Sequence, residues 1–517
     1  MPGDLLHSVV SGFQVSLLPI NLLYALCGAA VGTLIGVLPG VGSAGTIALL
    51  LPMTLGMPPV SAIIFLSGIY YGAMYGGSTT SILVNIPGEA ASVVTCLDGY
   101  QMACKGRAGP ALGMAAMASF IGGTFSIVGL MLVTPILAGV ARDFGPPEYF
   151  ALVCFGVLLL VYLGTGSMIK SLMAAAVGFT LSIVGQDIVT GEDRFTFGIV
   201  ELKDGIGLVP VFMGLFGIAE VLANLERPQR RDIYTTKIGS LFPTFKDWLD
   251  AKGAIVRGTV IGFFLGILPG GSAVIASFVS YAAEKMVSKH LERFGTGVIE
   301  GVAGPETANN AAAGGAFIPL FALGLPTNAS TAVLLVAFVL HGVRPGPMLV
   351  EQNPDMFWGV VTSMYVGNIA LIVFNLPLIG MWVQILKVPY RVLLPLIVLF
   401  SVIGTYSVRN STMDVTVMIV FGAVGYVMRR LAFDATPLVL AFILGPMLEQ
   451  ALRQSLILSR GSFAIFVTRP IAAAFFGAMA VLVLVGIVQY IRGNRGTLGA
   501  GLKAWGSDPI RDKSNEE

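Results

Sequence analysis

One apolar stretch of this chain occurs twice, and both copies carry a glycine at every fourth position. The first copy covers residues 28–40, the second covers residues 258–270, and each ends in Leu-Pro-Gly. Glycines at this spacing lie on one face of a helix and let a neighbouring helix approach closely inside a bilayer. The Pro-Gly pair that follows removes a backbone donor and predicts a helix break at membrane depth. Interrupted segments at corresponding places in two halves of a chain indicate the binding site of a transporter.

The composition agrees with a membrane setting. Of the 517 residues, 55% are hydrophobic and 11% are charged, whereas a soluble protein has about 25% charged residues. Because a helix needs roughly 20 apolar residues to span a bilayer, the apolar runs predict about 10–13 transmembrane or half-spanning helices. We therefore predict an all-α polytopic integral membrane protein that contains discontinuous or re-entrant helices. A net charge of +2 gives no reason to expect nucleic acid as a partner.

Four landmarks recur in the same order in the two halves of the chain, at separations of 230, 238, 239 and 237 residues. They predict two internal repeats. We expect the repeats to be inverted, because broken helices paired at the midplane are typical of that design. The four pairs are Gly40 with Gly270, Gly76-Gly77 with Gly314-Gly315, Ile86-Pro87 with Leu325-Pro326, and Gly109-Pro110 with Gly346-Pro347.

The repeats and the distribution of basic residues predict the organisation of the chain. Six Lys or Arg residues lie between positions 227 and 252, and five follow position 491. Basic loops stay in the cytoplasm, so we place both segments there and the mainly acidic segment 187–204 outside. The predicted divisions are residues 1–145 (first repeat), 146–253 (scaffold spans and a basic cytoplasmic loop), 254–355 (second repeat), 356–491 (scaffold spans) and 492–517 (cytoplasmic tail).

The breaks in the apolar helices suit the binding of small anions. Unpaired N–H groups and the macrodipole favour negative charge at a helix start, and each half offers two such starts. The motifs themselves contain no Arg or Lys, so anion binding would depend on helix dipoles and neutral donors. The predicted substrate-binding residues are Gly40, Ser43, Thr46, Pro87, Gly88, Gly270, Ser272, Pro326, Thr327 and Asn328.

A second set of polar residues suits a coupling ion. Carbonyl, amide and hydroxyl oxygens at broken helices bind Na⁺. Membrane hydroxyls also bond to their own helix carbonyls, and helix capping is the favoured alternative for Glu89 and Glu306. The predicted ion-binding residues, with Na⁺ as the possible metal, are Ser78, Thr79, Asn85, Glu306, Asn309 and Asn310.

Few residues suit enzymatic chemistry. The chain has three isolated histidines, no HExxH motif and no phosphate-binding G-x-x-x-x-G-K-[ST] sequence. We therefore predict that it is not an enzyme and has no cofactor. A channel or facilitator for small organic anions and a membrane scaffold without a transport path are the alternatives. The duplicated, polar and discontinuous helices favour a transporter over both.

Three long motifs, at residues 68–93, 266–285 and 301–332, resemble the TctA family, the large membrane subunit of tripartite tricarboxylate transporters. The resemblance extends over roughly residues 15–450. The residues that match the family pattern are Pro39-Gly40, Pro87-Gly88-Glu89, Glu306, Asn309-Asn310 and Pro326-Thr327-Asn328.

This resemblance implies a multi-pass transporter of the bacterial inner membrane that takes up small carboxylates such as citrate. A Na⁺ or H⁺ gradient would drive uptake without ATP. The implied partners are a small TctB-like membrane subunit and a TctC-like periplasmic binding protein that delivers the substrate. An elevator-like movement of the motif-bearing segments against a scaffold is a hypothesis by analogy. The particular carboxylate and the coupling ion do not follow from the resemblance.

Overall fold

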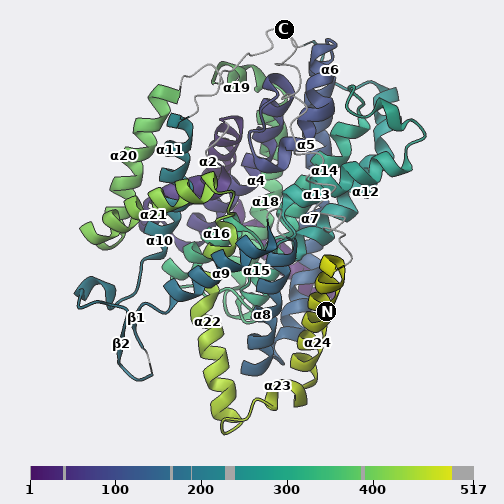
Figure 1. Ribbon diagram of the computed structural model, residues 1–517. Coiled ribbons are helices and arrows are strands. Elements are labelled where there is room, and N and C mark those ends of the chain that lie inside the picture. The colour runs from purple at the N-terminus through teal and green to yellow at the C-terminus, as the bar shows by residue number, and fades with distance from the viewer. Residues whose placement is uncertain are drawn as a thin grey trace.

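The computed structural model describes residues 2–38, 42–163, 167–187, 189–226, 239–385 and 390–491. This part of the chain is almost entirely helical, which confirms the all-α prediction (Figure 1). Its strands are β1 (Gly185–Gln186) and β2 (Asp193–Arg194), which pair antiparallel as one short hairpin.

Seven helical segments of the described chain are long and apolar enough to cross a membrane. They are α2 (Pro19–Val37), α4 (Pro59–Val84), α7 (Ala108–Ala141), α8 (Pro146–Leu163), Leu208–Glu226, α18 (Pro354–Asn375) and α21 (Thr412–Arg430). The same residues contain five shorter apolar helices, namely Ser43–Gly56, α9 (Met168–Ser182), α16 (Ala329–Leu340), Leu393–Arg409 and Pro470–Val485. These twelve elements identify a polytopic membrane protein, within the predicted range.

The segment Leu208–Glu226 comprises α10 (Leu208–Phe212), the π-helical η5 (Met213–Ile218) and α11 (Ala219–Glu226). The other helices are α1 (Pro2–Ser16), α3 (Ser43–Leu50), η1 (Leu51–Gly56), η2 (Ala90–Ser92), α5 (Val93–Thr95), η3 (Cys96–Tyr100), α6 (Gln101–Cys104), η4 (Val200–Leu202), α12 (Phe245–Ile267), α13 (Ala273–Val287), η6 (Leu291–Arg293), α14 (Glu300–Gly315), α15 (Phe317–Leu323), α17 (Leu349–Gln352), α19 (Ile379–Ile385), α20 (Tyr390–Arg409), α22 (Thr436–Leu458), α23 (Ile465–Thr468) and α24 (Pro470–Ile491).

The glycines of α2 bring this helix into direct contact with the backbone of α4. A Cβ atom at any of the three positions would overlap a carbonyl oxygen of α4, so a larger residue would push the helices apart. In chain order the contacts join Gly28 to Phe65, Gly32 to Ile69 and Gly36 to Ala73.

The glycines of α12 pack on α14 in the same way. The glycines in these contacts lie 230 positions after those of α2 in the sequence, and the residues they meet lie 239 positions after those of α4. The same pair of faces is therefore buried in both halves of the chain. These contacts join Gly258 to Gly304, Gly262 to Ala308 and Gly266 to Ala312.

The helices that lead into the polar motifs end at corresponding positions. Helix α4 is followed by Asn85 with a φ of 57°, and α15 is followed by Gly324 with a φ of 69°. Both residues adopt the left-handed conformation that ends a helix and that glycine and asparagine tolerate best. Helix α12 ends at Ile267, and Gly270 then has a φ of 79° before α13 begins.

Two crossed contacts tie each half to a loop of the other. The buried carboxylate of Asp98 accepts hydrogen bonds from the backbone N–H groups of Gly295, Gly297 and Val298, just before α14. His341 lies after α16, and its Nε2 is 3.1 Å from the hydroxyl of Thr54, just before α4. The loop that precedes each motif helix is thus held by the opposite half.

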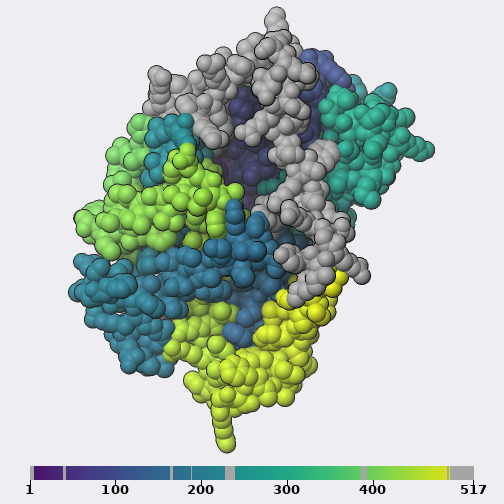
Figure 2. Space-filling view, viewed as in Figure 1, coloured from purple at the N-terminus to yellow at the C-terminus, as the bar shows by residue number. Residues whose placement is uncertain are grey.

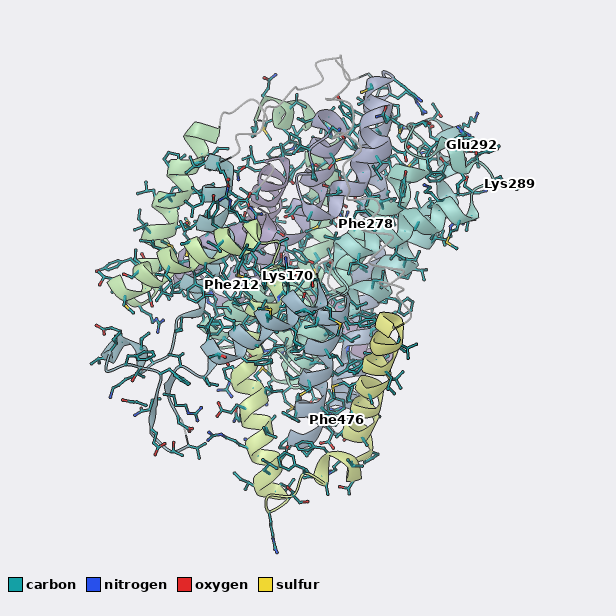
Figure 3. The ribbon with its side chains drawn as sticks, in the orientation of Figure 1. Lys170, Phe212, Phe278, Lys289, Glu292 and Phe476 are labelled. Atoms are coloured by element: carbon teal, nitrogen blue, oxygen red, sulfur yellow. The ribbon has the colours of Figure 1, made fainter. Side chains whose placement is uncertain are left out.

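Helices α12 to α14 lie on one side of the molecule, and α20 and α21 lie on the other (Figure 1). Phe212 is buried in the interior, whereas Lys289 and Glu292 lie at the outer tip of the loop after α13 (Figure 3). The β1–β2 hairpin projects at the lower left, below α20 and α21 (Figure 2).

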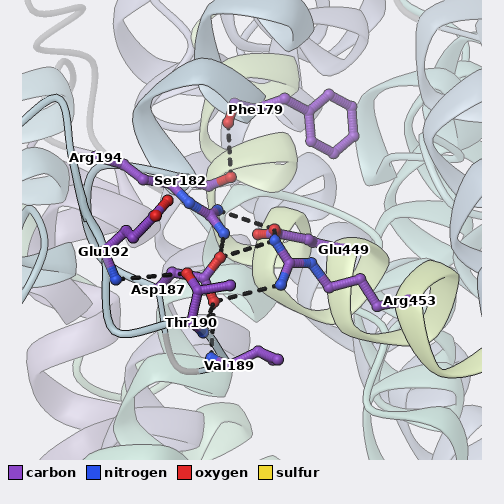
Figure 4. Close-up of polar contacts among 9 residues, drawn as sticks. All are labelled: Phe179, Ser182, Asp187, Val189, Thr190, Glu192, Arg194, Glu449 and Arg453. Carbon is purple, nitrogen blue, oxygen red and sulfur yellow. Dashed lines mark hydrogen bonds and ion pairs between the residues drawn. The ribbon is translucent and has the colours of Figure 1, made fainter. Parts of the chain in front are cut away.

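Ion pairs hold the base of this hairpin against α22. The buried carboxylate of Asp187 pairs with Arg194 of the hairpin and with Arg453, at 2.8 Å from its Nη2 (Figure 4). Glu449 pairs with the same two arginines at 2.9 and 2.8 Å. The projecting segment is therefore fixed at its base.

Candidate functional site

A cavity of about 680 Å³ lies where the broken motifs of the two halves meet. Two of its walls come from the first half, at the start of α3 and at the segment before η2. Two more come from the second half, at the starts of α13 and α16. The motif residues that line it are Gly42, Ser43, Pro87, Gly88, Glu89, Gly270, Ser272, Thr327, Asn328 and Ser330.

The start of α3 is bonded to both halves. The backbone N–H of Ser43 donates to Oε1 of Glu89 at 2.5 Å, so a carboxylate satisfies the first turn of this helix. The hydroxyl of Ser43 is 2.9 Å from that of Ser330 on α16, and both residues are buried. The two halves therefore meet through hydroxyl groups at the cavity wall.

The second half closes its two helix starts with neutral groups. Ser272 caps α13, because its hydroxyl accepts the N–H of Ile275 at 3.4 Å. Just before it, the N–H of Gly270 donates to the carbonyl oxygen of Thr327 at 3.0 Å. Asn328 caps α16, because its Oδ1 accepts the N–H of Thr331 at 3.0 Å. Its Nδ2 donates to the hydroxyl of Tyr70 on α4 at 3.0 Å, and Tyr70 also lines the cavity. The amide is thereby fixed in position.

The opposite wall is formed by η5, α11, α21 and the turn before α22. Arg429, near the end of α21, pairs with Glu220 of α11 at 2.5 Å, and Asp434 follows nearby. The Arg429 side chain is 53% exposed, so its guanidinium remains accessible beside the cavity. The wall facing the motifs thus carries a cation.

A second polar cluster surrounds Glu306, which lies on α14 and is fully buried. The hydroxyl of Ser78 donates to Oε2 at 2.5 Å, that of Thr95 donates to Oε1, and that of Ser119 donates more weakly at 3.5 Å. The Nδ2 of Asn310 donates to Ser119 at 2.7 Å. The carboxylate is thus held by hydroxyl groups from α4, α5 and α7.

This cluster adjoins a void of about 10 Å³, which is close to the space that one water molecule or a small ion requires. Its polar lining comes from Tyr75, Ser78, Thr79, Ser119 and Asn375. The Oδ1 of Asn375 is buried without a hydrogen-bond partner among the described residues, as are both polar atoms of Asn309. Oxygen ligands of this kind suit a hard cation.

Residues 22–440 match the sequence pattern of the tripartite tricarboxylate transporter TctA family. The chain belongs to this family. It is 48% identical to an uncharacterized 52.8 kDa protein of the TAR-I ttuC' 3' region of Agrobacterium vitis, over 95% of this chain and 98% of the relative. It is 28% identical to the 2-keto-3-deoxygluconate permease 1 of Salmonella typhimurium, over 46% of this chain and 72% of that protein. No solved structure matches the chain.

Seven of the predicted substrate-binding residues line the cavity of this TctA-family chain, and their binding role remains a prediction. The hydroxyl of Thr46 donates to the carbonyl of Gly42 at 2.8 Å, one turn inside α3. Pro326 lines a separate small void between α8 and α22. Gly40 lies outside the described residues. The seven are Ser43, Pro87, Gly88, Gly270, Ser272, Thr327 and Asn328.

Of the predicted ion-binding residues, Ser78, Glu306 and Asn310 share one hydrogen-bond network, and Asn309 is buried on the same helix, α14. Thr79 lines the adjoining void. Asn85 is exposed at the end of α4, where its left-handed backbone has a structural role.

The sequence prediction missed Arg429 and Glu220. Arg429 and Arg430 form a basic pair at the end of an apolar run. Such a pair is indistinguishable in sequence from the basic loops that set membrane orientation. Its position beside the cavity depends on how α21 packs, and α21 lies in a segment predicted to be scaffold.

Proposed function

We propose that this chain is the large membrane subunit of a tripartite transporter that takes up small carboxylates, such as citrate or related di- and tricarboxylates. Uptake is secondary active transport driven by a Na⁺ or H⁺ gradient. The observation that carries the proposal is the cavity of about 680 Å³ formed where helix starts of both halves meet. Family membership supports the same conclusion.

The cavity offers the donors that a carboxylate requires. Helix starts present N–H groups and a positive dipole end to an anion. Ser43, Thr327 and Asn328 add hydroxyl and amide donors, and Arg429 offers a guanidinium that suits bidentate carboxylate binding. A molecule with two or three carboxylates could contact both halves together.

The Glu306 cluster is the proposed site of a coupling ion. A buried carboxylate surrounded by hydroxyl and amide oxygens is costly unless a proton or cation neutralises it. Ser78 and Thr79 follow Tyr70 and Met74 along α4, so the cluster and the cavity share one helix. Movement of α4 would affect both sites.

We further infer that the two halves are inverted structural repeats. The constant separations of 230 and 239 residues in the glycine contacts support a repeat, as do the crossed contacts of Asp98 and His341. The cavity lies between the motif-bearing segments and elements of residues 146–253 and 356–491. This position is compatible with an elevator-like movement of the motifs against a scaffold.

The proposed setting is the bacterial inner membrane, with the C-terminus in the cytoplasm. The proposed partners are a small TctB-like membrane subunit and a TctC-like periplasmic binding protein, as family membership implies. The hairpin segment 187–204 would then face the periplasm.

Transport by the reconstituted complex tests this proposal. Uptake of radiolabelled citrate and succinate would be measured in proteoliposomes under a Na⁺ gradient, a proton gradient or neither. We expect accumulation above equilibrium under one gradient and slower uptake in Ser43→Ala and in Asn328→Ala. Equilibration without accumulation would indicate a channel or facilitator, and absence of any flux would indicate a scaffold subunit.

A further inference from the structure

We infer that Glu89 couples a proton to the entry of the substrate, because its carboxylate occupies the position at the start of α3 that a substrate carboxylate requires. The inference rests on the proposed function and adds a coupling group that is separate from the Glu306 cluster. Protonation of Glu89 frees this position for the substrate.

The geometry places the Glu89 carboxylate at an anion-binding position. Its Oε1 accepts the backbone N–H of Ser43 at 2.5 Å, at the first residue of α3. Glu89 is half-buried, and it lines the same cavity as Ser330 and Asn328. A substrate carboxylate would bind this helix start through the same donor. Glu89 and the substrate therefore compete for one group.

The charged side chains around the cavity make the competition between Glu89 and the substrate depend on whether Glu89 is protonated. In the part of the chain that the structure describes, the titratable and charged side chains lining the cavity are Tyr70 of α4, Glu220 of α11, Arg429 of α21, Asp434 before α22, and Glu89 itself. Arg429 already pairs with Glu220. With the three carboxylates ionised, the lining has a net negative charge that repels an anionic substrate. A proton on Glu89 removes one of these charges.

The step involves only a proton and hydrogen bonds. A proton from the outer solution adds to a carboxylate oxygen of Glu89 and gives a neutral acid, which is a weak acceptor for the N–H of Ser43. The substrate carboxylate then accepts that N–H. On the inner side the proton leaves, and the Glu89 carboxylate takes the N–H back as the substrate departs. One proton crosses with each substrate molecule.

No other group considered as a proton carrier competes with the substrate for the N–H groups of a helix start. Glu306 is fully buried and its partners are hydroxyl groups that do not line the cavity. In the second half the position that follows Pro326-Thr327 is Asn328, whose amide does not titrate in this range. Glu220 faces the cavity, but its carboxylate is held by Arg429.

Calorimetry can count the proton directly. Citrate and succinate would be titrated into the purified complex at about pH 8, well above the ordinary carboxyl pKa, in two buffers of different ionisation enthalpy. We expect about one proton taken up per bound anion by the wild type, and none by Glu89→Gln, which still binds the anion. Glu148→Gln is the matched control and should retain the proton uptake, because Glu148 also accepts a backbone N–H, that of Gly145 at 2.9 Å, but does not line the cavity.

Transport gives a second measurement if Glu89→Gln lowers the yield of protein. With one proton per substrate, a gradient of about one pH unit supports about tenfold accumulation, since each 1.4 kcal/mol is tenfold. With Na⁺ equal on both sides, so that a Na⁺ ion in the Glu306 cluster supplies no driving force, Glu89→Gln should exchange labelled for unlabelled substrate across the membrane but accumulate none. Proton uptake by Glu89→Gln, or proton-driven accumulation by it, would overturn the inference. The inference would also be overturned if folded Glu89→Gln neither exchanged nor accumulated substrate. Absence of uptake by the wild type would instead reject the proposed function.

Discussion

The two halves bring the same backbone pattern to the cavity but different side-chain chemistry. In the first half, Glu89 places a carboxylate at the start of α3. In the second half, the residue 239 positions later is Asn328, which caps its own helix with an amide. The first half thus provides a cavity wall with a titratable carboxylate, and the second half provides a wall with neutral donors. On the proposed function, coupling would belong to the first half and constant recognition to the second.

The helices behind these walls do not differ in this way. The glycine contacts of α2 with α4 and of α12 with α14 bury the same faces, three in each half. The two halves therefore share the packing of their glycine helices but differ in the charge of the side chains at the cavity. The following predictions are ordered by the size of the expected effect.

The largest effect is expected for Gly32→Ala and Gly262→Ala. In each case the new Cβ would overlap a backbone carbonyl of the partner helix, and overpacking of this kind typically costs about 1–3 kcal/mol. The yield and the melting temperature of the detergent-purified protein should fall by the same amount in the two variants. Gly477→Ala is the matched control, because its Cβ would meet open space. A loss confined to one half would show that the two contacts are not equivalent.

Asn328→Ala should reduce uptake by about tenfold or more. It removes a helix cap, which is worth about 1 kcal/mol, together with the hydrogen bond to Tyr70. Asn353→Ala is the control, because Asn353 also precedes a helix but makes no capping hydrogen bond. Uptake in proteoliposomes and the melting temperature would be measured for both variants. If Asn328→Ala took up substrate at the wild-type rate, the amide would contribute to packing and not to transport.

Ser43→Ala and Ser330→Ala should each reduce uptake a few-fold, since a neutral hydrogen bond contributes about 0.5–1.5 kcal/mol. Their hydroxyl groups are 2.9 Å apart and join the halves. The double variant should be little worse than either single variant, because both remove one interaction. Strictly additive losses would mean that the two serines act independently.

The smallest effect is expected for Arg429→Gln, the cation on the wall opposite both halves. Its side chain is 53% exposed and that of its partner Glu220 is 13% exposed, and an ion pair with one solvated member contributes about 0–1 kcal/mol to stability. The melting temperature should therefore hardly change, while the KM for uptake rises about threefold to fivefold, which corresponds to roughly 1 kcal/mol. Arg430→Gln is the neighbouring control, because Arg430 pairs with Glu226 and does not line the cavity. An unchanged KM would remove Arg429 from substrate binding.

The polar breaks were predictable because they are costly in hydrocarbon. Ser43, Ser272 and Asn328 stand out in sequence, since each follows an interrupted apolar run. The structure brings all three to one cavity. Asn85 stands out for the same reason, but it ends a helix at an exposed position. Residue type alone does not separate a ligand from a helix cap, because both need the same polar atoms.

The sequence by itself determined the all-α polytopic class, the close-packed glycine helices and the positions of the breaks. These features depend on local hydrophobicity, glycine spacing and the missing donor of proline. Only the tertiary structure decided that Ser43 meets Ser330, 287 residues away, and that Arg429 and Glu220 complete the cavity. Those contacts depend on how distant helices pack, and no short-range pattern in the chain encodes that packing.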